Sequence, residues 1–311
     1  MDFNHISVLK EETINYLNIR PDGVYVDGTL GGGGHAYEVA RRLTSGTLVG
    51  IDRDDAAITA AGQRLSEFSE RVKLVRDNFK NAKSVLSELG IDGIDGAMLD
   101  LGVSSHQLDE GERGFSYRME APLDMRMDRR QALSAHTVVN TYSEGDLSRI
   151  IADYGEERFA RAIARRIVQA RKEREITTTT ELADLILSAF PAAARRNASG
   201  HPAKRTFQAI RIEVNGELEI LKDAVYDLFS CLKPGGRLAI ITFHSLEDRA
   251  VKQVFTDLST GCTCSKKLPV CVCGRVAQGT LITRKPFVAT AEEQEQNHRA
   301  HSAKLRVIMK N

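Results

Sequence analysis

The chain has 311 residues, and its 43 Lys and Arg against 42 Asp and Glu give a formal net charge of +1. That length allows one large or two ordinary domains, and the near-neutral balance excludes a basic surface spread over the whole molecule, so any basic surface must be local. No apolar stretch is long enough to cross a membrane, and residues 1–12 are charged where a signal peptide has its apolar centre. We therefore expect a cytoplasmic protein that has no membrane association.

A strand, a glycine-rich loop and a helix are predicted near the start of the chain. The β-prone run Val24–Asp27 ends in a carboxylate, four consecutive glycines follow at 31–34, and helical spacing covers Ala36–Leu43. An ordinary surface turn needs fewer glycines. We interpret the loop as a ligand site, where the backbone takes positive φ angles and lies close against the ligand.

The second predicted strand, Thr47–Ile51, is closed by Asp52. An acidic residue at the end of the second strand, about twenty residues beyond the glycine loop, binds ribose hydroxyls in nucleotide-binding α/β folds. The alternative is that Asp52 caps the following helix, but Asp54 or Asp55 is better placed for that purpose.

Two further strands carry candidate residues at their carboxyl ends. Val72–Val75 is followed by Phe79, an aromatic side chain that either covers a purine ring or belongs to the core. The apolar strand Gly96–Leu101 contains Asp100 at the edge of the sheet where α/β folds place their chemistry. No Gly-x-Ser-x-Gly motif occurs, which disfavours a hydrolase.

Helical periodicity replaces the βα alternation from about residue 109 to 205, which predicts an all-helical insert. Capping boxes are predicted at Ser143 and at Thr178. From Arg113 to Arg211 there are 18 Lys and Arg against 12 Asp and Glu, so this segment is +6 and the remainder −5. Its arginine stripe either is a solvated helix face or contacts a polyanion, and we favour the polyanion. The stripe consists of Arg158, Arg161 and Arg165.

The βα pattern resumes in residues 206–311, where Asn215-Gly216 is expected to split a long helical stretch. The strand Arg237–Phe243 leads to His244, and we read Ser245 with Asp248 as the cap of the next helix, which leaves His244 to reach the crevice. Two last β-prone runs, Leu281–Lys285 and Lys304–Met309, are expected to form a hairpin at the sheet edge.

Four of the five cysteines form two Cys-x-Cys pairs near the carboxyl end of the chain. Four thiolates can close a structural zinc site, although zinc knuckles more often use Cys-x-x-Cys. Reduced thiols in a mobile loop are the alternative, and both interpretations stay open. The pairs are Cys262 with Cys264 and Cys271 with Cys273.

The glycine loop does not match Gly-x-Gly-x-x-Gly, whereas Asp27-x-Thr29-x-Gly31-x-Gly33 and an antiparallel last strand are typical of methyltransferases that use S-adenosylmethionine. The chain resembles the MraW-like family, bacterial enzymes that methylate the N4 amine of a cytosine in the decoding region of small-subunit (16S) ribosomal RNA. One departure is Ser7, where the family usually has proline. The motifs that carry the resemblance are His5-x-x-Val8-Leu9, Asp27-Gly28-Thr29, Gly32-Gly33-Gly34-His35, Leu99-Asp100-Leu101-Gly102-Val103-Ser104-Ser105, Arg113-Gly114-Phe115-Ser116, Pro122-Leu123-Asp124-Met125-Arg126-Met127-Asp128, Phe207-Gln208-Ala209-Ile210-Arg211-Ile212 and Phe243-His244-Ser245-Leu246-Glu247-Asp248-Arg249.

The resemblance implies an α/β fold: a Rossmann-like methyltransferase sheet with an antiparallel last strand and an inserted all-helical domain. The expected domain parts are 1–108 and 206–311 for the methyltransferase and 109–205 for the insert. S-adenosylmethionine is the implied cofactor, 16S rRNA within a small ribosomal subunit particle is the implied partner, and no stable protein partner is indicated. The implied cofactor contacts are Gly33, Gly34, His35, Asp52, Phe79, Asp100 and Gln107, of which Gln107 rests on the resemblance alone.

For the reaction we expect Asp100 to accept a hydrogen bond from the cytosine amine, with His244 as a second catalytic candidate. Two other functions remain open. A methyltransferase acting on another RNA or a small molecule would share the sheet, and a non-catalytic RNA-binding assembly factor would share the basic insert.

Overall fold

The computed structural model describes residues 7–104, 107, 111–196, 200–265, 270 and 272–311. Contacts divide the chain into two compact units. We call Met1–Gly102 with Leu218–Asn311 the sheet unit, and Val103–Glu217 the helical unit. None of the helices in the described ranges is both long and apolar enough to span a lipid bilayer.

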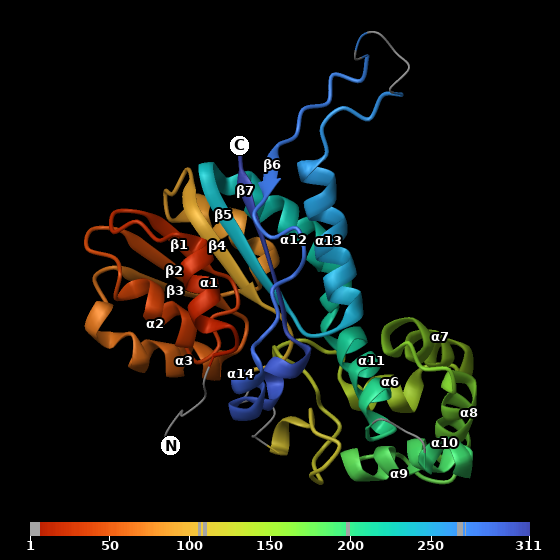
Figure 1. Ribbon diagram of the computed structural model, residues 1–311. Helices are drawn as coiled ribbons and strands as arrows, with labels where there is room; N and C mark the ends of the chain where they lie inside the picture. The colour runs from red at the N-terminus through yellow and green to blue at the C-terminus, as the bar shows by residue number, and fades with distance from the viewer. Residues whose placement is uncertain (1–6, 105–106, 108–110, 197–199, 266–269, 271) are drawn as a thin grey trace. The chain divides into compact units, whose positions relative to one another are not determined.

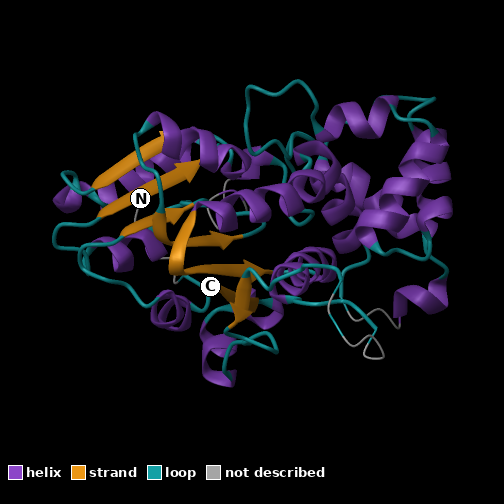
Figure 2. Cartoon of the chain, turned by 90° about the horizontal axis from the view of Figure 1, so that it is seen from above, coloured by secondary structure: helices purple, strands orange, loops and turns teal. Residues whose placement is uncertain are grey.

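In the described residues, seven strands form one sheet with the order β3-β2-β1-β4-β5-β7-β6 (Figures 1 and 2). The pairings from β3 to β5 are parallel, and β7 runs antiparallel to both β5 and β6. The predicted sheet and its antiparallel last strand are thus confirmed. The strands are β1 (Val24–Asp27), β2 (Thr47–Asp52), β3 (Val72–Arg76), β4 (Ile94–Asp100), β5 (Leu232–Thr242), β6 (Gly279–Leu281) and β7 (Lys304–Lys310).

Helices cover both faces of this sheet. One face packs against α1 (Lys10–Leu17), α2 (Gly34–Ala40), α3 (Asp55–Arg64) and the 3₁₀ helix η4 (His298–Ser302). The other face packs against α4 (Ala82–Glu88), α12 (Glu217–Cys231) and α13 (Ser245–Ser259). The sheet unit also contains η1 (Ser66–Phe68), η2 (Phe79–Asn81) and α14 (Ala291–Gln296).

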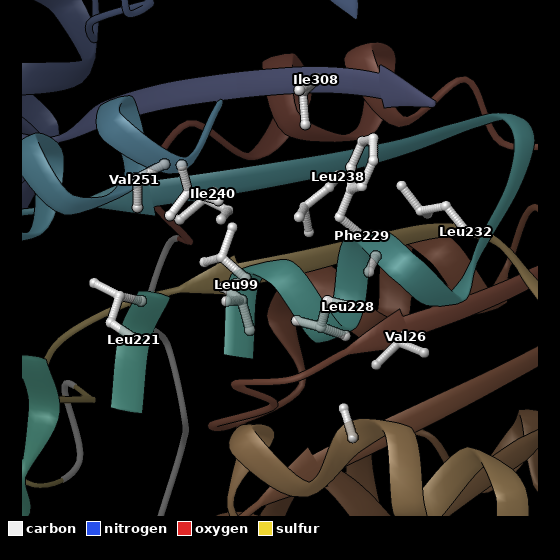
Figure 3. Packing of buried hydrophobic residues seen from close by; sticks show 14 of the residues in the cluster. Val26, Leu99, Leu221, Leu228, Phe229, Leu232, Leu238, Ile240, Val251 and Ile308 are labelled. Carbon is white, nitrogen blue, oxygen red and sulfur yellow. The ribbon is translucent and has the colours of Figure 1, made fainter. Parts of the chain in front are cut away.

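The central strands are buried on both faces, which explains their near-continuous apolar sequence. Figure 3 shows the second face, where Leu99 of β4 and Leu238 of β5 lie in one cluster with Leu228 and Phe229 of α12. All four side chains are at most 2% exposed. Because such tight packing fixes the strands, the residues at the strand ends are held in defined positions.

The helical unit has its own apolar core, built around α7 and its neighbours α8 and α11. The capping box predicted at Thr178 is confirmed, with Glu181 as its partner at the start of α9. At the start of α7, Ser143 makes the N-cap bond of the predicted box by accepting the Asp146 N–H. The helices are α6 (Ala135–Thr141), α7 (Glu144–Gly155), α8 (Ala160–Ala170), α9 (Thr179–Ala189), α10 (Ala192–Arg196) and α11 (Ala203–Asn215), with η3 at Gly111–Arg113.

The helical unit covers Val103–Glu217, whereas the expected insert covers 109–205. The difference comes from α11, whose Phe207, Ile210 and Val214 are buried in the helical core. The chain leaves this helix at Gly216, which takes a positive φ of 59° and separates α11 from α12 as the sequence indicated.

Candidate functional site

Three neighbouring strands of the sheet each end in an aspartate: β2 at Asp52, β1 at Asp27 and β4 at Asp100. The strands are parallel, so their carboxyl ends meet at one edge. The charges of Asp100 and Asp52 both act on Asp27. The sheet therefore gathers three carboxyl groups around the glycine loop that follows β1.

Backbone hydrogen bonds fold this glycine loop onto the adjacent strands. Gly28 donates to Met98 of β4 at 3.0 Å, and Leu30 donates to Ile51 of β2 at 3.0 Å. Gly31 and Gly33 take positive φ angles of 49° and 75°, which glycine adopts at little cost. The predicted strand, loop and helix are confirmed.

The glycines of this loop differ in what surrounds them. A Cβ on Gly33 would lie 3.3 Å from the Cβ of Ala61 in α3, and a Cβ on Gly34 would lie 2.0 Å from the Ser7 Oγ. Gly31 is different, because a Cβ there would meet nothing nearer than a backbone oxygen at 3.9 Å. Packing within the chain thus explains why Gly33 and Gly34 have no side chain. At Gly31 the chain leaves space beside the backbone, which a ligand can approach. Contacts of Gly33 and Gly34 with a cofactor remain a prediction.

Asp52 ties the glycine loop to the start of α3. Its Oδ2 accepts the Gly31 N–H at 2.8 Å and its Oδ1 accepts the Asp54 N–H at 2.9 Å. Asp54 itself is the N-cap of α3, as expected. Burial raises the pKa of Asp52, and the two N–H donors oppose that shift. Each carboxyl oxygen keeps a further lone pair with which to accept a hydroxyl.

Asp100 contains a buried carboxyl oxygen, Oδ1, that has no hydrogen-bond partner among the described residues. The Asp100 backbone N–H donates to the Thr29 Oγ1 at 2.5 Å, which ties the end of β4 to the loop. Burial raises the pKa of Asp100, while the charges of His35 and Arg299 oppose the shift and that of Glu247 adds to it. An unpaired buried acceptor is costly in a folded protein and marks a site that a ligand donor can complete.

His35 lies at the start of α2 and is 5% exposed. Its Nε2 is 3.1 Å from the carbonyl oxygen of Val8, so Nε2 carries the proton and donates. Burial lowers the pKa of the imidazole, although the Asp100 charge works against that effect. His35 thus positions the segment before α1 against the glycine loop.

Two groups of this site were given no site role from the sequence, although Asp27 belongs to the motif of the glycine loop. Asp27 is 1% exposed, and burial together with the Asp100 and Asp52 charges raises its pKa to about 7. Its Oδ1 accepts the Thr29 N–H at 3.2 Å. Arg299 of η4 lies over the Phe243 ring at 5.3 Å and acts on Asp100 through its charge. The position of Asp27 at a strand end was visible in the sequence, whereas no motif marks Arg299.

Phe79 begins η2 directly after β3, where Asn78 caps the turn by accepting the Lys80 N–H. Its ring is half-buried against the core on the α12 face of the sheet. The two interpretations of Phe79, core residue and purine cover, are both compatible with a partly exposed ring, so its cofactor contact stays a prediction.

The expected cap of α13 is wrong. His244, and not Ser245, is the N-cap: its Nδ1 accepts the Glu247 N–H at 3.4 Å, and Glu247 binds back to the His244 backbone. The Nε2 of His244 is 3.0 Å from Glu247 Oε1, and the side chain is only 10% exposed. The predicted strand ended at Phe243, whereas β5 ends at Thr242. The N-cap of α13 therefore falls one residue earlier than predicted. The catalytic role of His244 stays a prediction, while the observed role of this side chain is to cap the helix.

The remaining predicted residues lie in the helical unit or in the cysteine segment. Gln107 is 5% exposed, and its Oε1 accepts the Ser104 N–H at 3.1 Å. All residues of the arginine stripe are exposed: Arg158 precedes α8, and Arg161 and Arg165 lie on that helix. Within the stripe, Arg165 is 3.6 Å from Glu144 and Arg158 lies over the Phe159 ring at 4.7 Å.

The sheet-edge groups fit S-adenosylmethionine chemically. The carboxylates of Asp52 and Asp100 favour a cationic sulfonium, and Asp52 also offers lone pairs to ribose hydroxyls. The open face at Gly31 and the unpaired oxygen of Asp100 add a backbone approach and a vacant acceptor.

Comparison with known proteins agrees with this geometry. A sequence profile described as the MraW methylase family matches residues 2–311. The chain is 59% identical over 313 residues to ribosomal RNA small subunit methyltransferase H 2 of Agathobacter rectalis, covering 100% of this chain and 99% of the relative. It is 54% identical to ribosomal RNA small subunit methyltransferase H of Brevibacillus brevis, covering 100% of this chain and 99% of the relative. The protein of the same name from Clostridium botulinum strain Kyoto is 57% identical, with full coverage of both chains.

Proposed function

The chain belongs to the MraW methylase family, and from this premise we propose that it methylates the N4 amine of a cytosine in 16S ribosomal RNA of the small ribosomal subunit. As a member of the family it is an S-adenosylmethionine-dependent methyltransferase. The relatives that match over their whole length carry the name ribosomal RNA small subunit methyltransferase H, which supports the substrate. An RNA substrate of this kind also places the reaction in the cytoplasm.

The observation that carries the proposed chemistry is the buried Oδ1 of Asp100 at the end of β4, which has no hydrogen-bond partner in the described part of the chain. The exocyclic amine of cytosine is a weak nucleophile because its lone pair is delocalised into the ring. A fixed acceptor that takes a hydrogen bond from one N–H bends that bond out of the ring plane, which localises the lone pair on nitrogen. Asp100 is such an acceptor, held by the Thr29 hydroxyl and by the packed strand behind it.

Bound S-adenosylmethionine supplies a methyl group on a positively charged sulfur, and the carbon–sulfur bond breaks as the carbon–nitrogen bond forms. The amine nitrogen becomes positive in this step, and one of the two protons it carries becomes acidic. Asp100 accepts that proton and passes it to water. Burial raises the pKa of Asp100, which makes its carboxylate a stronger base for this purpose.

The protein's other groups bind and orient. Asp52 accepts the ribose hydroxyls, Gly31 offers its open backbone face, and the ring of Phe79 covers the purine. Gly33, Gly34, His35 and Gln107 complete the proposed contacts. The arginine stripe of α8 holds the RNA backbone, because exposed guanidinium groups pair well with phosphates. The target base turns out of its stack to reach Asp100.

The experiment compares methyl transfer from labelled S-adenosylmethionine to naked 16S rRNA, to unmethylated small-subunit particles and to free nucleosides. Label recovered as N4-methylated cytidine from RNA or particles supports the proposal. Label in a different base, or in free nucleosides alone, overturns the substrate. Calorimetry with S-adenosylmethionine is the companion measurement, since absence of binding would leave a non-catalytic RNA-binding protein.

A further inference from the structure

The segment between α13 and β6 has a fixed base. Arg275 Nε donates to the carbonyl oxygen of Thr260 at 3.0 Å, and its guanidinium also binds the Asp257 carboxylate at 2.6 Å. The Gln278 N–H donates to the carbonyl oxygen of Leu258 at 2.8 Å. Figure 1 shows the chain running out beyond the end of α13 and returning to β6. Hydrogen bonds at the base therefore fix where the segment leaves the sheet unit.

Beyond this base the described residues of the segment bury little apolar surface. Val270, Val272 and Val276 are 71%, 77% and 78% exposed, which places them among the most exposed large apolar side chains of the described chain. A short segment that buries so little apolar surface needs another form of cross-link to hold a defined conformation.

Three cysteine sulfurs come together in this segment. The Sγ atoms of Cys262, Cys264 and Cys273 all lie within 4.8 Å of one another. The Sγ atoms of Cys262 and Cys273 are 3.7 Å apart, well beyond the roughly 2.05 Å of a disulfide. Zinc–sulfur bonds of about 2.3 Å at tetrahedral angles place two sulfur ligands ~3.8 Å apart, so the observed spacing is that of two ligands on one zinc ion.

The backbone around the sulfurs also suits a bound metal. Gly274 directly follows Cys273 and takes a positive φ of 60°, which turns the chain sharply at that ligand. The backbone N–H groups of Val272 and Cys273 act as hydrogen-bond donors to the Cys264 sulfur. Such N–H donors stabilise a thiolate ligand and orient it toward the ion.

We propose that Cys262, Cys264 and Cys273 bind a structural zinc ion that cross-links the segment between α13 and β6. An all-sulfur donor set selects zinc over calcium or magnesium, which prefer oxygen ligands. Cys271, which forms a Cys-x-Cys motif with Cys273 in the sequence, lies outside the described residues. The proposal is made for the three described thiols. The site is independent of methyl transfer, so it stands or falls separately from the proposed function.

The test measures zinc bound to the purified full-length protein under reducing conditions, with the C231S variant as a matched control. Cys231 is a half-buried thiol of α12 outside the cluster. We expect about one zinc per chain in the wild type and in C231S. We expect zinc affinity to be weaker by at least about tenfold in C262S and in C273S, since even the loss of an outer partner of a metal ligand costs this much.

Cobalt replacement gives a second measurement that does not depend on enzyme activity. A sulfur-to-cobalt charge-transfer band in the wild type that disappears in the C262S/C273S double variant supports the site. Far-UV circular dichroism should stay unchanged in all variants, because the three sulfurs lie outside the buried clusters. A wild-type protein that binds no zinc above the level of the double variant, or that shows no such cobalt band, overturns the proposal.

Discussion

Replacing the buried carboxyl at the end of β1 should change how the stability of the protein depends on pH. Burial raises the pKa of Asp27 from the ordinary 3.8 to about 7. The folded state therefore binds this proton more tightly than the unfolded state does. The stability that the protonated group contributes is complete below pH 3.8 and is lost as the pH rises through about 7.

The magnitude follows from the pKa shift, which is about three pKa units, or ~4 kcal/mol at ~1.36 kcal/mol per unit. Roughly two of these units lie between pH 5 and pH 8, so the wild type should lose ~2.7 kcal/mol of unfolding free energy there through this group. Asp27→Asn keeps the shape of the side chain and an oxygen that accepts the Thr29 N–H, but it carries no charge. Its stability should fall by ~2.7 kcal/mol less than that of the wild type over the same range.

The assay is urea unfolding followed by far-UV circular dichroism at pH 5, 6, 7 and 8. Asp92→Asn, at an exposed position, is the matched control and should follow the wild-type pH dependence. Equal pH slopes for the Asp27→Asn variant and the wild type would refute the reasoning, because burial would then not hold the proton on this carboxyl.

Gly33→Ala should lower the free energy of unfolding by ~1–2 kcal/mol and weaken S-adenosylmethionine binding, because alanine is strained at a φ of 75° and its Cβ meets Ala61. The control is Gly90→Ala, since Gly90 has a similar φ of 69° and open space where the Cβ would lie. This variant should lower stability but leave cofactor affinity unchanged in calorimetry. Equal losses of affinity in the two variants would contradict the assignment of the loop. Asp52→Ala should weaken S-adenosylmethionine binding at least about tenfold, since the ribose acceptor and the bond to Gly31 are both lost; unchanged affinity would remove Asp52 from the site. Replacing the three arginines of the stripe by Gln should raise the KM for RNA and leave cofactor affinity unchanged. The slope of log affinity against log salt should become shallower by about two, at ~0.7 per phosphate contact. An unaltered slope would show that the stripe is only a solvated helix face.

The strand-end carboxylates could be predicted because parallel strands bring their carboxyl ends to one edge. Asp52 and Asp100 were recognisable from an apolar run closed by an acidic residue, and Asp54 from its position before a helix. The antiparallel last strand, β7, was predictable from its β-prone composition. Its hairpin partner β6 was predicted at 281–285 but covers Gly279–Leu281. In each case a local pattern and one rule of sheet geometry were sufficient.

Other features depend on packing that no local pattern encodes. The start of α13 contains two overlapping cap patterns, His244 with Glu247 and Ser245 with Asp248. Because β5 ends at Thr242, His244 takes the N-cap position. The helical unit includes α11 because of which core its apolar face joins, although its periodicity resembles that of α12. Arg299 lies nearly two hundred residues after Asp100 in the sequence, and only the folded chain brings its charge close enough to lower the pKa of Asp100.

The most direct test of the central claim is single-turnover methyl transfer by Asp100→Ala and Asp100→Asn at saturating S-adenosylmethionine, with labelled N4-methylated cytidine as the product measured. If Asp100 orients the amine and accepts its proton, Ala should lose roughly 10²-fold or more in rate while cofactor binding changes little. Asn should be intermediate, because its oxygen still accepts a hydrogen bond but does not balance the charge that develops on nitrogen. Equal saturated rates for Asp100→Ala and the wild type would contradict the account.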